Sequence, residues 1–279
     1  EIHERLVGSE MCIRDRANKM KKFVALLLAV LMVASLCACG QKDTGSDLQT
    51  VTKGKLIMST NAEFAPYEYV ADDGKGFQGT GYEGIDIEIA YALAQKLGLE
   101  LVVDNMDFDA ALSAVQTGKS DMVAAGVTVT PDRLNAMSFT DSYANGVQVV
   151  IVKEGSDIKS IDDLQGKKIG TQRGTTGFLY CSDDFGDDNV IGFDDGATAV
   201  QNLKAGKIDC VVIDNVPAQE YVKANPGLTI LDTEYANEDY AIGIAKDNTA
   251  LQEALNKALA ELKADGTIQS IIDKYIPAK

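Results

Sequence analysis

The sequence predicts an α/β fold made of two similar lobes, and three observations support this prediction. Segments typical of strands and of helices alternate from Thr52 to the end of the chain, which favours an α/β architecture with largely parallel sheets. That length suits one large domain or two smaller lobes. One helix–turn–strand pattern also occurs twice, which favours two lobes.

Apolar spacing and capping residues define the first elements of this alternation. In chain order we expect a strand at 55–59, a helix capped by Asp86 and ended by Gly98, a strand at 101–103, and a helix capped by Asp109 and ended by Gly118. In the first of these helices, apolar residues at positions 90, 93, 94 and 97 recur at the spacing of one helical face. This order of elements is typical of a parallel sheet covered by helices.

The repeated pattern lies at 114–126 and again at 199–214. Each copy begins Ala-Val-Gln, reaches a glycine followed by a lysine, and continues into an apolar strand. A chance likeness of two βα units is the alternative interpretation. If the repeat is structural, the lobes face each other, and a ligand binds outside the carboxyl ends of their strands. Gly126 and Asp214 would then lie on opposite walls of a cleft.

The segment 125–133 has the pattern of an anion site. Its small residues end an apolar strand, Thr130 is placed to cap a helix, and Pro131 takes the first helical position. Arg133 then falls in the first helical turn, beside free backbone N–H groups. Together these groups suit a carboxylate, which arginine can bind through two parallel hydrogen bonds. A surface turn with a solvated arginine is the alternative.

Two further segments have the chemistry of a charged site. The loop 174–177 precedes a short expected helix at 178–180, so its amides are free for an anion, although a simple loop is the alternative. Asp214 ends an apolar strand, where an unpaired carboxylate is costly, so it needs a cation. The alternative for Asp214 is capping of the helix that follows Asn215.

Composition excludes several classes of function. The chain carries 26 Lys and Arg against 42 Asp and Glu, a net charge of −16, which argues against nucleic acid or an anionic membrane as partner. Its single histidine is His3, so catalysis by a Ser-His or Cys-His pair and a His-ligated metal are not expected. We expect no cofactor. Cys181 and Cys210 could pair or remain free.

Residues 20–38 resemble a bacterial lipoprotein signal peptide. A basic start is followed by an apolar run, 23–36, which is too short for a membrane span of roughly 20 residues. The run ends Leu-Cys-Ala-Cys-Gly and resembles a lipobox with Cys39 as the lipidated residue; an ordinary signal peptide is the alternative. We interpret 1–19 as a non-native extension and 39–51 as a polar tether.

Seven segments, in order, resemble one known family. They are Thr60–Tyr67, Gly84–Glu88, Met106–Phe108, Ala125–Arg133, Gly170–Thr176, Ile213–Asp214 and Tyr240–Ala245. Through them, the chain from about Lys53 to Lys279 resembles the family 3 extracellular solute-binding proteins, which are the amino-acid receptors of bacterial ABC importers. Each segment alone is a weak signal, whereas the ordered set behind a lipobox is a strong one.

The resemblance implies a type II periplasmic-binding-protein fold, in which two α/β lobes joined by a two-strand hinge close over the ligand. The implied parts are lobe 1 at 52–142 and 241–279, lobe 2 at 148–234, and a hinge at 143–147 and 235–240.

The resemblance also implies a set of ligand-binding residues. They are Asn61, the aromatic pair Phe64 and Phe108 that would bracket the ligand side chain, Ala125, Gly126, Thr128, Arg133, Gln172, Thr175, Thr176 and Asp214. Arg133 would bind the α-carboxylate of an amino acid, together with the backbone N–H groups of Thr128 and Thr176. Asp214 would bind the α-ammonium group, together with the Thr128 hydroxyl and a carbonyl near Gly126.

The family resemblance places Asn61 and Gln172 at the tip of the ligand side chain. Several relatives carry Asp at the first position and Lys or Arg at the second, whereas both residues here are neutral amides. This slightly favours a neutral polar amino acid such as glutamine. Glu63 or Asp107 could still accept a cationic tip, so lysine and arginine stay open.

The function that these features predict is a lipid-anchored, extracytoplasmic, monomeric receptor that is not an enzyme. It would bind a free L-amino acid and deliver it to an ABC permease, with the lipid as its only membrane contact. One alternative is an enzyme that resembles the cyclohexadienyl dehydratases, for which Glu63 is the one candidate general acid. Another is a ligand sensor for a signalling receptor.

Overall fold

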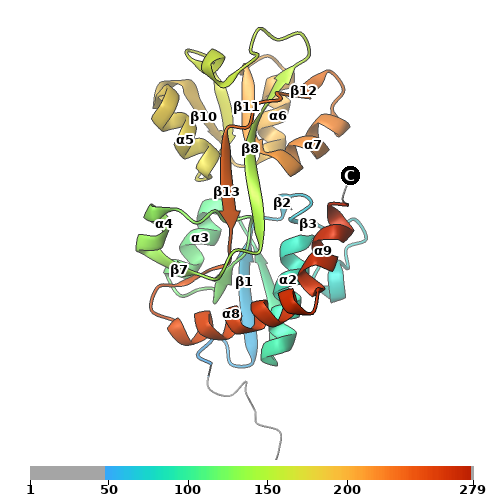
Figure 1. The fold of residues 1–279 in the computed structure, drawn as a ribbon, viewed down its shortest axis with the longest axis vertical. Coiled ribbons are helices and arrows are strands. Elements are labelled where there is room, and N and C mark those ends of the chain that lie inside the picture. The colour runs from blue at the N-terminus through green and yellow to red at the C-terminus, as the bar shows by residue number, and fades with distance from the viewer. Residues whose placement is uncertain (1–47, 278–279) are drawn as a thin grey trace, which may run out of the picture. The chain divides into compact units, whose positions relative to one another are not determined.

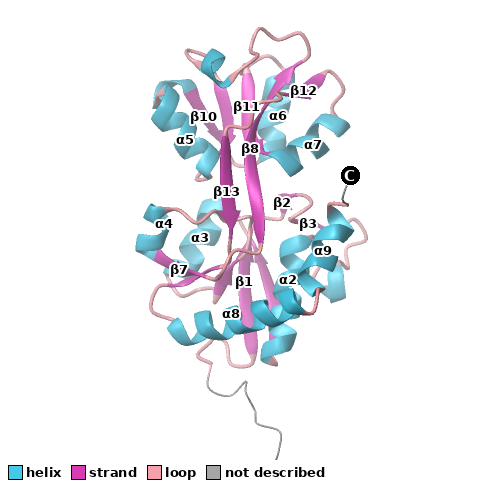
Figure 2. Cartoon of the chain, in the orientation of Figure 1, coloured by secondary structure: helices cyan, strands magenta, loops and turns pink. Residues whose placement is uncertain are grey.

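The computed structural model describes residues 48–277, which fold into two lobes, each built around its own β-sheet (Figure 1). Lobe 1 contains a five-stranded sheet of order β5-β1-β6-β14-β7 and a small sheet of order β2-β3-β4. Lobe 2 contains a sheet of order β10-β9-β11-β8-β12, in which β13 also pairs with β8. Helices flank both large sheets (Figure 2).

The strands are β1 (Lys55–Thr60), β2 (Glu63–Phe64), β3 (Glu68–Val70), β4 (Tyr82–Glu83), β5 (Glu100–Asn105), β6 (Met122–Val123), β7 (Met137–Phe139), β8 (Ala144–Lys153), β9 (Ile169–Gln172), β10 (Val190–Phe193), β11 (Cys210–Asp214), β12 (Leu228–Ile230), β13 (Ala236–Tyr240) and β14 (Gly243–Ala245). The helices of lobe 1 are α2 (Ile85–Leu97), α3 (Phe108–Gln116), α4 (Pro131–Ala136), α8 (Thr249–Ala264) and α9 (Thr267–Tyr275). Those of lobe 2 are α5 (Thr176–Phe185), α6 (Gly196–Lys204) and α7 (Asn215–Ala224). Short 3-10 helices are η1 (Phe77–Gly79), η2 (Ile161–Leu164) and η3 (Asp187–Asn189).

The large sheets are parallel in one half only. In lobe 1, β5, β1 and β6 are parallel, and β14 joins them antiparallel; in lobe 2, β10, β9 and β11 are parallel, and β8 joins them antiparallel. The expectation of largely parallel sheets therefore holds for the βα units. It fails where the chain crosses from one lobe to the other and back, because the returning strands run in the opposite direction.

The two crossings lie side by side. Strands β8 and β13 pair antiparallel from Ala144↔Tyr240 to Gln148↔Ala236, and both run between the lobes (Figure 1). Each lobe has its own apolar core on either side of its large sheet. Movement of one lobe against the other therefore does not require a shared core to break. The lobe limits given above stay a proposal.

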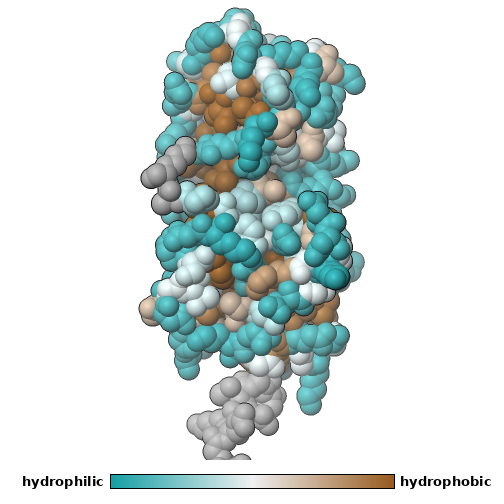
Figure 3. Space-filling view, turned by 90° about the vertical axis from the view of Figure 1, so that its right-hand side faces the viewer, coloured by the Kyte–Doolittle hydropathy of each residue, from teal (hydrophilic) through white to brown (hydrophobic). Residues whose placement is uncertain are grey.

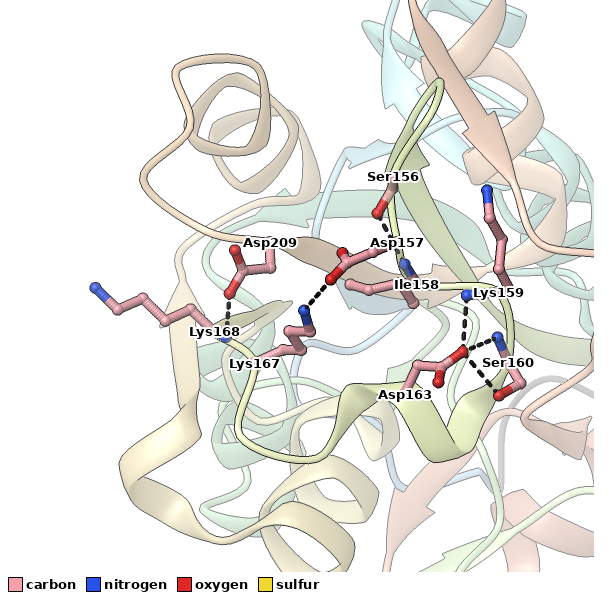
Figure 4. A network of polar contacts seen from close by, with 9 residues as sticks. All are labelled: Ser156, Asp157, Ile158, Lys159, Ser160, Asp163, Lys167, Lys168 and Asp209. Carbon is pink, nitrogen blue, oxygen red and sulfur yellow. Dashed lines mark hydrogen bonds and ion pairs between the residues drawn. The ribbon is translucent and has the colours of Figure 1, made fainter.

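The repeat seen in the sequence is structural. In lobe 1, the backbone N–H of Asp121 donates to the Ile57 carbonyl (2.9 Å), and the Asp121 carboxylate accepts the N–H of Ile57 (2.7 Å). In lobe 2, Asp209 exchanges the same two bonds with Lys168 at 2.8 and 2.7 Å (Figure 4). The two aspartates occupy equivalent places in the repeated Gly-Lys-X-Asp turns, so each orders the strand that leads to the cleft.

Two predicted helix caps are wrong. Helix α2 has Gly84 as its N-cap, with φ of +125°, and an added Cβ there would lie 2.2 Å from the Tyr67 carbonyl oxygen, so only glycine fits. Asp86 is instead buried within the first turn. Helix α3 begins after Asp107 rather than Asp109, without a side-chain cap. Helix α5 continues to residue 185, beyond its expected end at 180.

Other expectations concern the cysteines and the N-terminus. Cys181 and Cys210 are both buried and free. The extension, signal peptide and Cys39 lie outside the described residues. Within 48–277, no helix is both long and apolar enough to span a bilayer. The face on the side of α7 and α9 is mainly hydrophilic, and its largest apolar area lies over lobe 2 (Figure 3).

Candidate functional site

A cavity between the lobes, near the crossings, is lined by every residue that the sequence assigned to ligand binding. These are Asn61, Phe64, Phe108, Ala125, Gly126, Thr128, Arg133, Gln172, Thr175, Thr176 and Asp214. The space between these residues that no atom fills amounts to about 450 Å³, a figure that includes open solvent. The structure thus brings the set together, and the binding role of each member stays a prediction.

Arg133 projects from α4 into this cavity and is only 8% exposed. Its helix begins as expected, because the Thr130 side chain accepts the N–H of Arg133 (3.2 Å) and Pro131 occupies the first turn. The guanidinium donates to the carbonyl of Thr128 in lobe 1 (2.9 Å) and to that of Gly174 in lobe 2 (3.1 Å). It also stacks 5.4 Å from the centre of the Phe108 ring.

The Arg133 guanidinium has no carboxylate partner within ion-pair distance in the described part of the chain. Burial lowers its pKa from the ordinary value, although an arginine remains charged at any physiological pH. Two backbone carbonyls occupy two of its five N–H groups, and the remaining donors are available to an anion. A ligand carboxylate would supply the missing counter-charge.

Asp214 lies on the opposite wall, at the end of β11, and is 1% exposed. One carboxylate oxygen accepts the Val216 N–H (2.9 Å), and the other accepts the Val147 N–H (3.0 Å) and the Tyr240 hydroxyl (2.9 Å). The alternative interpretation of Asp214 as a helix cap is therefore confirmed, since Asp214 caps α7. It also lines the cavity, so capping and ligand binding do not exclude each other.

Burial raises the pKa of Asp214 to about 6, and three hydrogen bonds to the carboxylate oppose that rise. A nearby cation would favour the ionised form. Asp214 and Arg133 thus present opposite charges to one cavity from opposite lobes.

Free amides lie beside Arg133. Among the described residues, the backbone N–H of Thr128 and that of Thr176, the first residue of α5, have no protein acceptor. Thr175 caps α5 through its side chain, which accepts the Phe178 N–H (3.3 Å). An anion in the cavity would therefore meet a guanidinium, unpaired amides and a helix N-terminus.

Asn61 and Gln172, which also line the cavity, join the lobes. Nε2 of Gln172 donates to Oδ1 of Asn61 (2.8 Å) and to the Asp194 carbonyl (3.2 Å). Nδ2 of Asn61 donates to the Met106 carbonyl (3.0 Å). Because backbone carbonyls accept only, these contacts define which way both amides point.

Six residues of the cavity lining were not predicted from the sequence: Glu68, Gln148, Val212, Ile213, Glu238 and Tyr240. Ile213 and Tyr240 stand in the segments that carried the family resemblance, but nothing there assigned them a role. Gln148 and Glu238 lie on the two crossing strands and bond to each other at 3.0 Å. No local pattern indicates this pair, because it depends on strand pairing between positions 90 residues apart.

The fold and the cleft define a class of protein, the two-lobed binding proteins that enclose a small solute between α/β lobes. The family model for bacterial extracellular solute-binding proteins, family 3, matches residues 56–278, and this chain belongs to that family. The type II periplasmic-binding-protein fold predicted from the sequence is confirmed by the structural neighbours.

Relatives with established roles are similar over most of their length. The arginine-binding extracellular protein ArtP of Bacillus subtilis (strain 168) is 33% identical over 266 residues, covering 92% of this chain and 98% of ArtP. ABC transporter arginine-binding protein 1 of Escherichia coli (strain K12) is 34% identical, covering 80% and 91%. A solved structure of an ancestral arginine-binding protein bound to glutamine is 40% identical, with a TM-score of 0.75, covering 81% and 100%.

Proposed function

We propose that this chain is an extracytoplasmic receptor that binds a free L-amino acid with a cationic side chain between its lobes and delivers it to an ABC importer. The observation that carries the proposal is the buried pair of opposite charges, Arg133 and Asp214, at one cavity. An α-amino acid presents a carboxylate and an ammonium group on one carbon, and the two walls complement these groups.

The orientation of the Asn61 and Gln172 amides supports a ligand tip that donates hydrogen bonds. Both N–H groups of the Gln172 amide bond within the protein, so its carbonyl oxygen is the group left for a ligand. The Asn61 oxygen likewise has a free lone pair. The subsite therefore offers acceptors, which suit a guanidinium or ammonium. A carboxamide has one acceptor and one donor group. In one of its two orientations, its oxygen would face the Gln172 and Asn61 oxygens, and no hydrogen bond would form.

Acidic residues outside the cavity lining but near these amides add to this preference. Burial first, and then the negative charges of Asp195, Asp107 and Asp194, raise the pKa of Glu63. Glu63 and Asp107 belong to lobe 1, whereas Asp194 and Asp195 belong to lobe 2, so closure brings like charges together. A cationic tip would relieve that repulsion, and a neutral tip would not.

This proposal departs from the preference for a neutral ligand that the two amides alone suggested. Residue type showed only that both are uncharged, whereas their hydrogen bonds determine which atoms remain for a ligand. Two relatives named for arginine binding support the cationic choice, and the ancestral protein bound to glutamine shows that a neutral ligand must be tested.

L-Arginine and L-citrulline test the proposal, because citrulline has nearly the same shape but carries an oxygen where arginine has an N–H₂ group. By titration calorimetry, we expect L-arginine to bind at least about 30-fold more tightly, since an unpaired buried acceptor costs about 2 kcal/mol. A thermal-shift screen of the twenty amino acids gives the wider comparison. Equal binding of citrulline would contradict the cationic class only, whereas no binding of any amino acid would contradict the receptor.

Gly174 tests whether binding requires the lobes to close. It has φ of +74°, and an added Cβ would lie 1.6 Å from Oδ1 of Asp109 in lobe 1. Gly174→Ala should therefore weaken L-arginine binding by up to about tenfold, because the exposed Asp109 carboxylate must turn away from the methyl group when the lobes close and a positive φ costs about 1 kcal/mol. Adding Asp109→Ala should restore much of the affinity, and Asp109→Ala alone is the control. No rescue in the double variant would show that the loss is local backbone strain.

Lipid attachment at Cys39, the monomeric state and the partner permease stay predictions from the sequence. Mass spectrometry of the protein extracted from membranes of its expression host would identify an acylated N-terminal cysteine.

A further inference from the structure

Lobe 1 holds two buried carboxyl groups, Glu68 on β3 and Asp86 on α2. Each side chain is 1% exposed, and Glu68 lines the cavity. Oδ2 of Asp86 accepts the Gly126 N–H (2.9 Å) and the Tyr143 hydroxyl (2.7 Å). Oδ1 of Asp86 and both oxygens of Glu68 are buried with no donor among the described residues.

One proton shared between the two carboxyl groups would give two of these three oxygens a hydrogen-bond partner. Two carboxylates in contact inside a protein do not both ionise, so the pair retains a proton between them. Burial and the neighbouring Asp86 carboxylate raise the pKa of Glu68 well above its ordinary value. A proton on Glu68 would have Oδ1 of Asp86, the oxygen of that carboxylate without a donor, as its acceptor. One oxygen of Glu68 then remains without a partner, in a residue that lines the cavity.

Glu68 and Asp214 line the same cavity, one from each lobe. The Tyr67 ring packs edge-on against the Tyr240 ring, with centroids 5.4 Å apart, and the Tyr240 hydroxyl bonds to Asp214. Burial, and after it the negative charges of Asp214, Asp86 and Glu68, raises the pKa of Tyr67. Asp214 already accepts three hydrogen bonds, so it has room for about one more, whereas an ammonium group has three to donate. With the Thr128 hydroxyl as a second acceptor, one N–H of the ammonium group remains, and Glu68 would accept it in place of the carbonyl near Gly126.

We propose that Glu68 is a ligand-binding residue: it holds the proton that it shares with Asp86 and offers its other oxygen to the α-ammonium group of the bound amino acid. The inference rests on the proposed function above. Glu68 acts as a neutral acceptor, and Asp86 keeps the negative charge and orients it. Because Asp86 also holds the Gly126 N–H, the pair connects the ammonium subsite to the wall formed by 125–133.

Four variants test this arrangement, with L-arginine and L-glutamine as the calorimetric probes at pH 7.5. Glu68→Gln should bind within about threefold of wild type, because the amide donates to Asp86 and its oxygen still faces the ammonium group. Asp86→Asn should bind equally well or more tightly, because the new amide at position 86 donates to Glu68 and leaves that carboxyl ionised. Glu68→Leu should lose at least about tenfold, since the acceptor is gone.

The double variant Glu68→Gln with Asp86→Asn gives the sharpest result. With both carboxyls replaced by amides, the amide at position 68 must either turn its N–H₂ toward the ammonium group or oppose the N–H₂ at position 86. We therefore expect a loss of at least about tenfold from two changes that are each nearly neutral. A packing role alone would not produce this non-additivity in binding. The thermal midpoint of each variant, and Glu83→Gln in the neighbouring strand β4, serve as controls.

The outcomes separate this inference from the proposed function. If Glu68→Leu binds like wild type, Glu68 does not contact the ligand. If Glu68→Gln is as weak as Glu68→Leu, Glu68 acts through its charge and the shared proton is wrong. If Glu68→Leu does not fold, the double variant decides, and additive behaviour there overturns the inference. Failure of wild-type protein to bind either probe would overturn the proposed function itself.

Discussion

Replacing Arg133 by alanine should weaken the binding of L-arginine by about 30- to 1000-fold, or about 2–4 kcal/mol. The guanidinium is 8% exposed and lacks a carboxylate partner in the described residues, so a ligand carboxylate would be its counter-charge. Without Arg133, that carboxylate would be buried beside Phe108 with only backbone amides as donors. Titration calorimetry with wild-type and variant protein measures the change.

Arg173→Ala is the matched control for this experiment. Arg173 lies close by in sequence to the cleft residue Gln172, but it is exposed and pairs with Asp194 at 2.8 Å on the rim. Its removal should change the affinity by no more than about threefold, because exposed ion pairs contribute about 0–1 kcal/mol. An Arg133→Ala variant that binds as tightly as wild type would refute the assignment of the carboxylate site. Arg133→Lys tests geometry, since lysine keeps the charge but loses the planar pair of donors.

Replacing Asp214 by alanine should weaken the binding of L-arginine by a similar factor, about 30- to 1000-fold. The α-ammonium group would lose its charged partner, and the Val147 N–H and the Tyr240 hydroxyl would lose their acceptor. The variant should therefore also unfold at a lower temperature. To separate the two effects, binding is compared at a temperature where both proteins are folded. Asp209→Ala, which removes a strand-ordering aspartate outside the cavity lining, is the control for stability loss without loss of binding.

The same residue predicts how affinity depends on pH. Burial raises the pKa of Asp214 to about 6 in the ligand-free protein, so the carboxylate is ionised at pH 7.5 and protonated below 6. Binding an ammonium group favours the ionised form, so below pH 6 the ligand must displace a proton. The dissociation constant of L-arginine should then rise about tenfold per pH unit below 6 and be nearly constant above 7. A flat profile between pH 7 and 5 would contradict this role.

The stability of the ligand-free protein should follow the opposite trend. A carboxyl whose pKa is higher in the folded state than in the unfolded chain binds its proton more tightly when folded. Asp214 and Asp86, both with pKa values raised to about 6, therefore add stability at low pH that is lost as pH rises from about 4 to about 6. As the pH falls from about 6 to about 4, the affinity for the ligand therefore decreases, while protonation of these two groups stabilises the ligand-free protein.

Local patterns were sufficient for the first strands and helices and for the repeated units, and, through the family resemblance, for most of the residues that line the cleft. The Thr130-Pro131 helix start formed as expected, and the repeated Gly-Lys-X-Asp turn formed the same backbone exchange around Asp121 and Asp209. Patterns of this kind depend on interactions within a few residues, which the sequence displays directly. Asp86 shows the limit: an acidic residue at a helix start is usually a cap, and only the approach of Gly126 and Tyr143 makes it a buried acceptor.

By itself, the sequence determined the two-lobed α/β architecture, the placement of the charged residues Arg133 and Asp214 on opposite walls of the cleft, and much of the cavity lining. Tertiary structure alone decided what those residues leave available to a ligand. The amides of Asn61 and Gln172 are neutral by type, but their hydrogen bonds, one of which joins positions 111 apart, occupy N–H groups within the protein. These contacts leave the Gln172 oxygen and one lone pair of the Asn61 oxygen for a ligand. Glu68 likewise becomes a candidate only once Asp86 is placed beside it. The physical reason is that residue type specifies the donors and acceptors a side chain has, whereas packing decides which of them are already used.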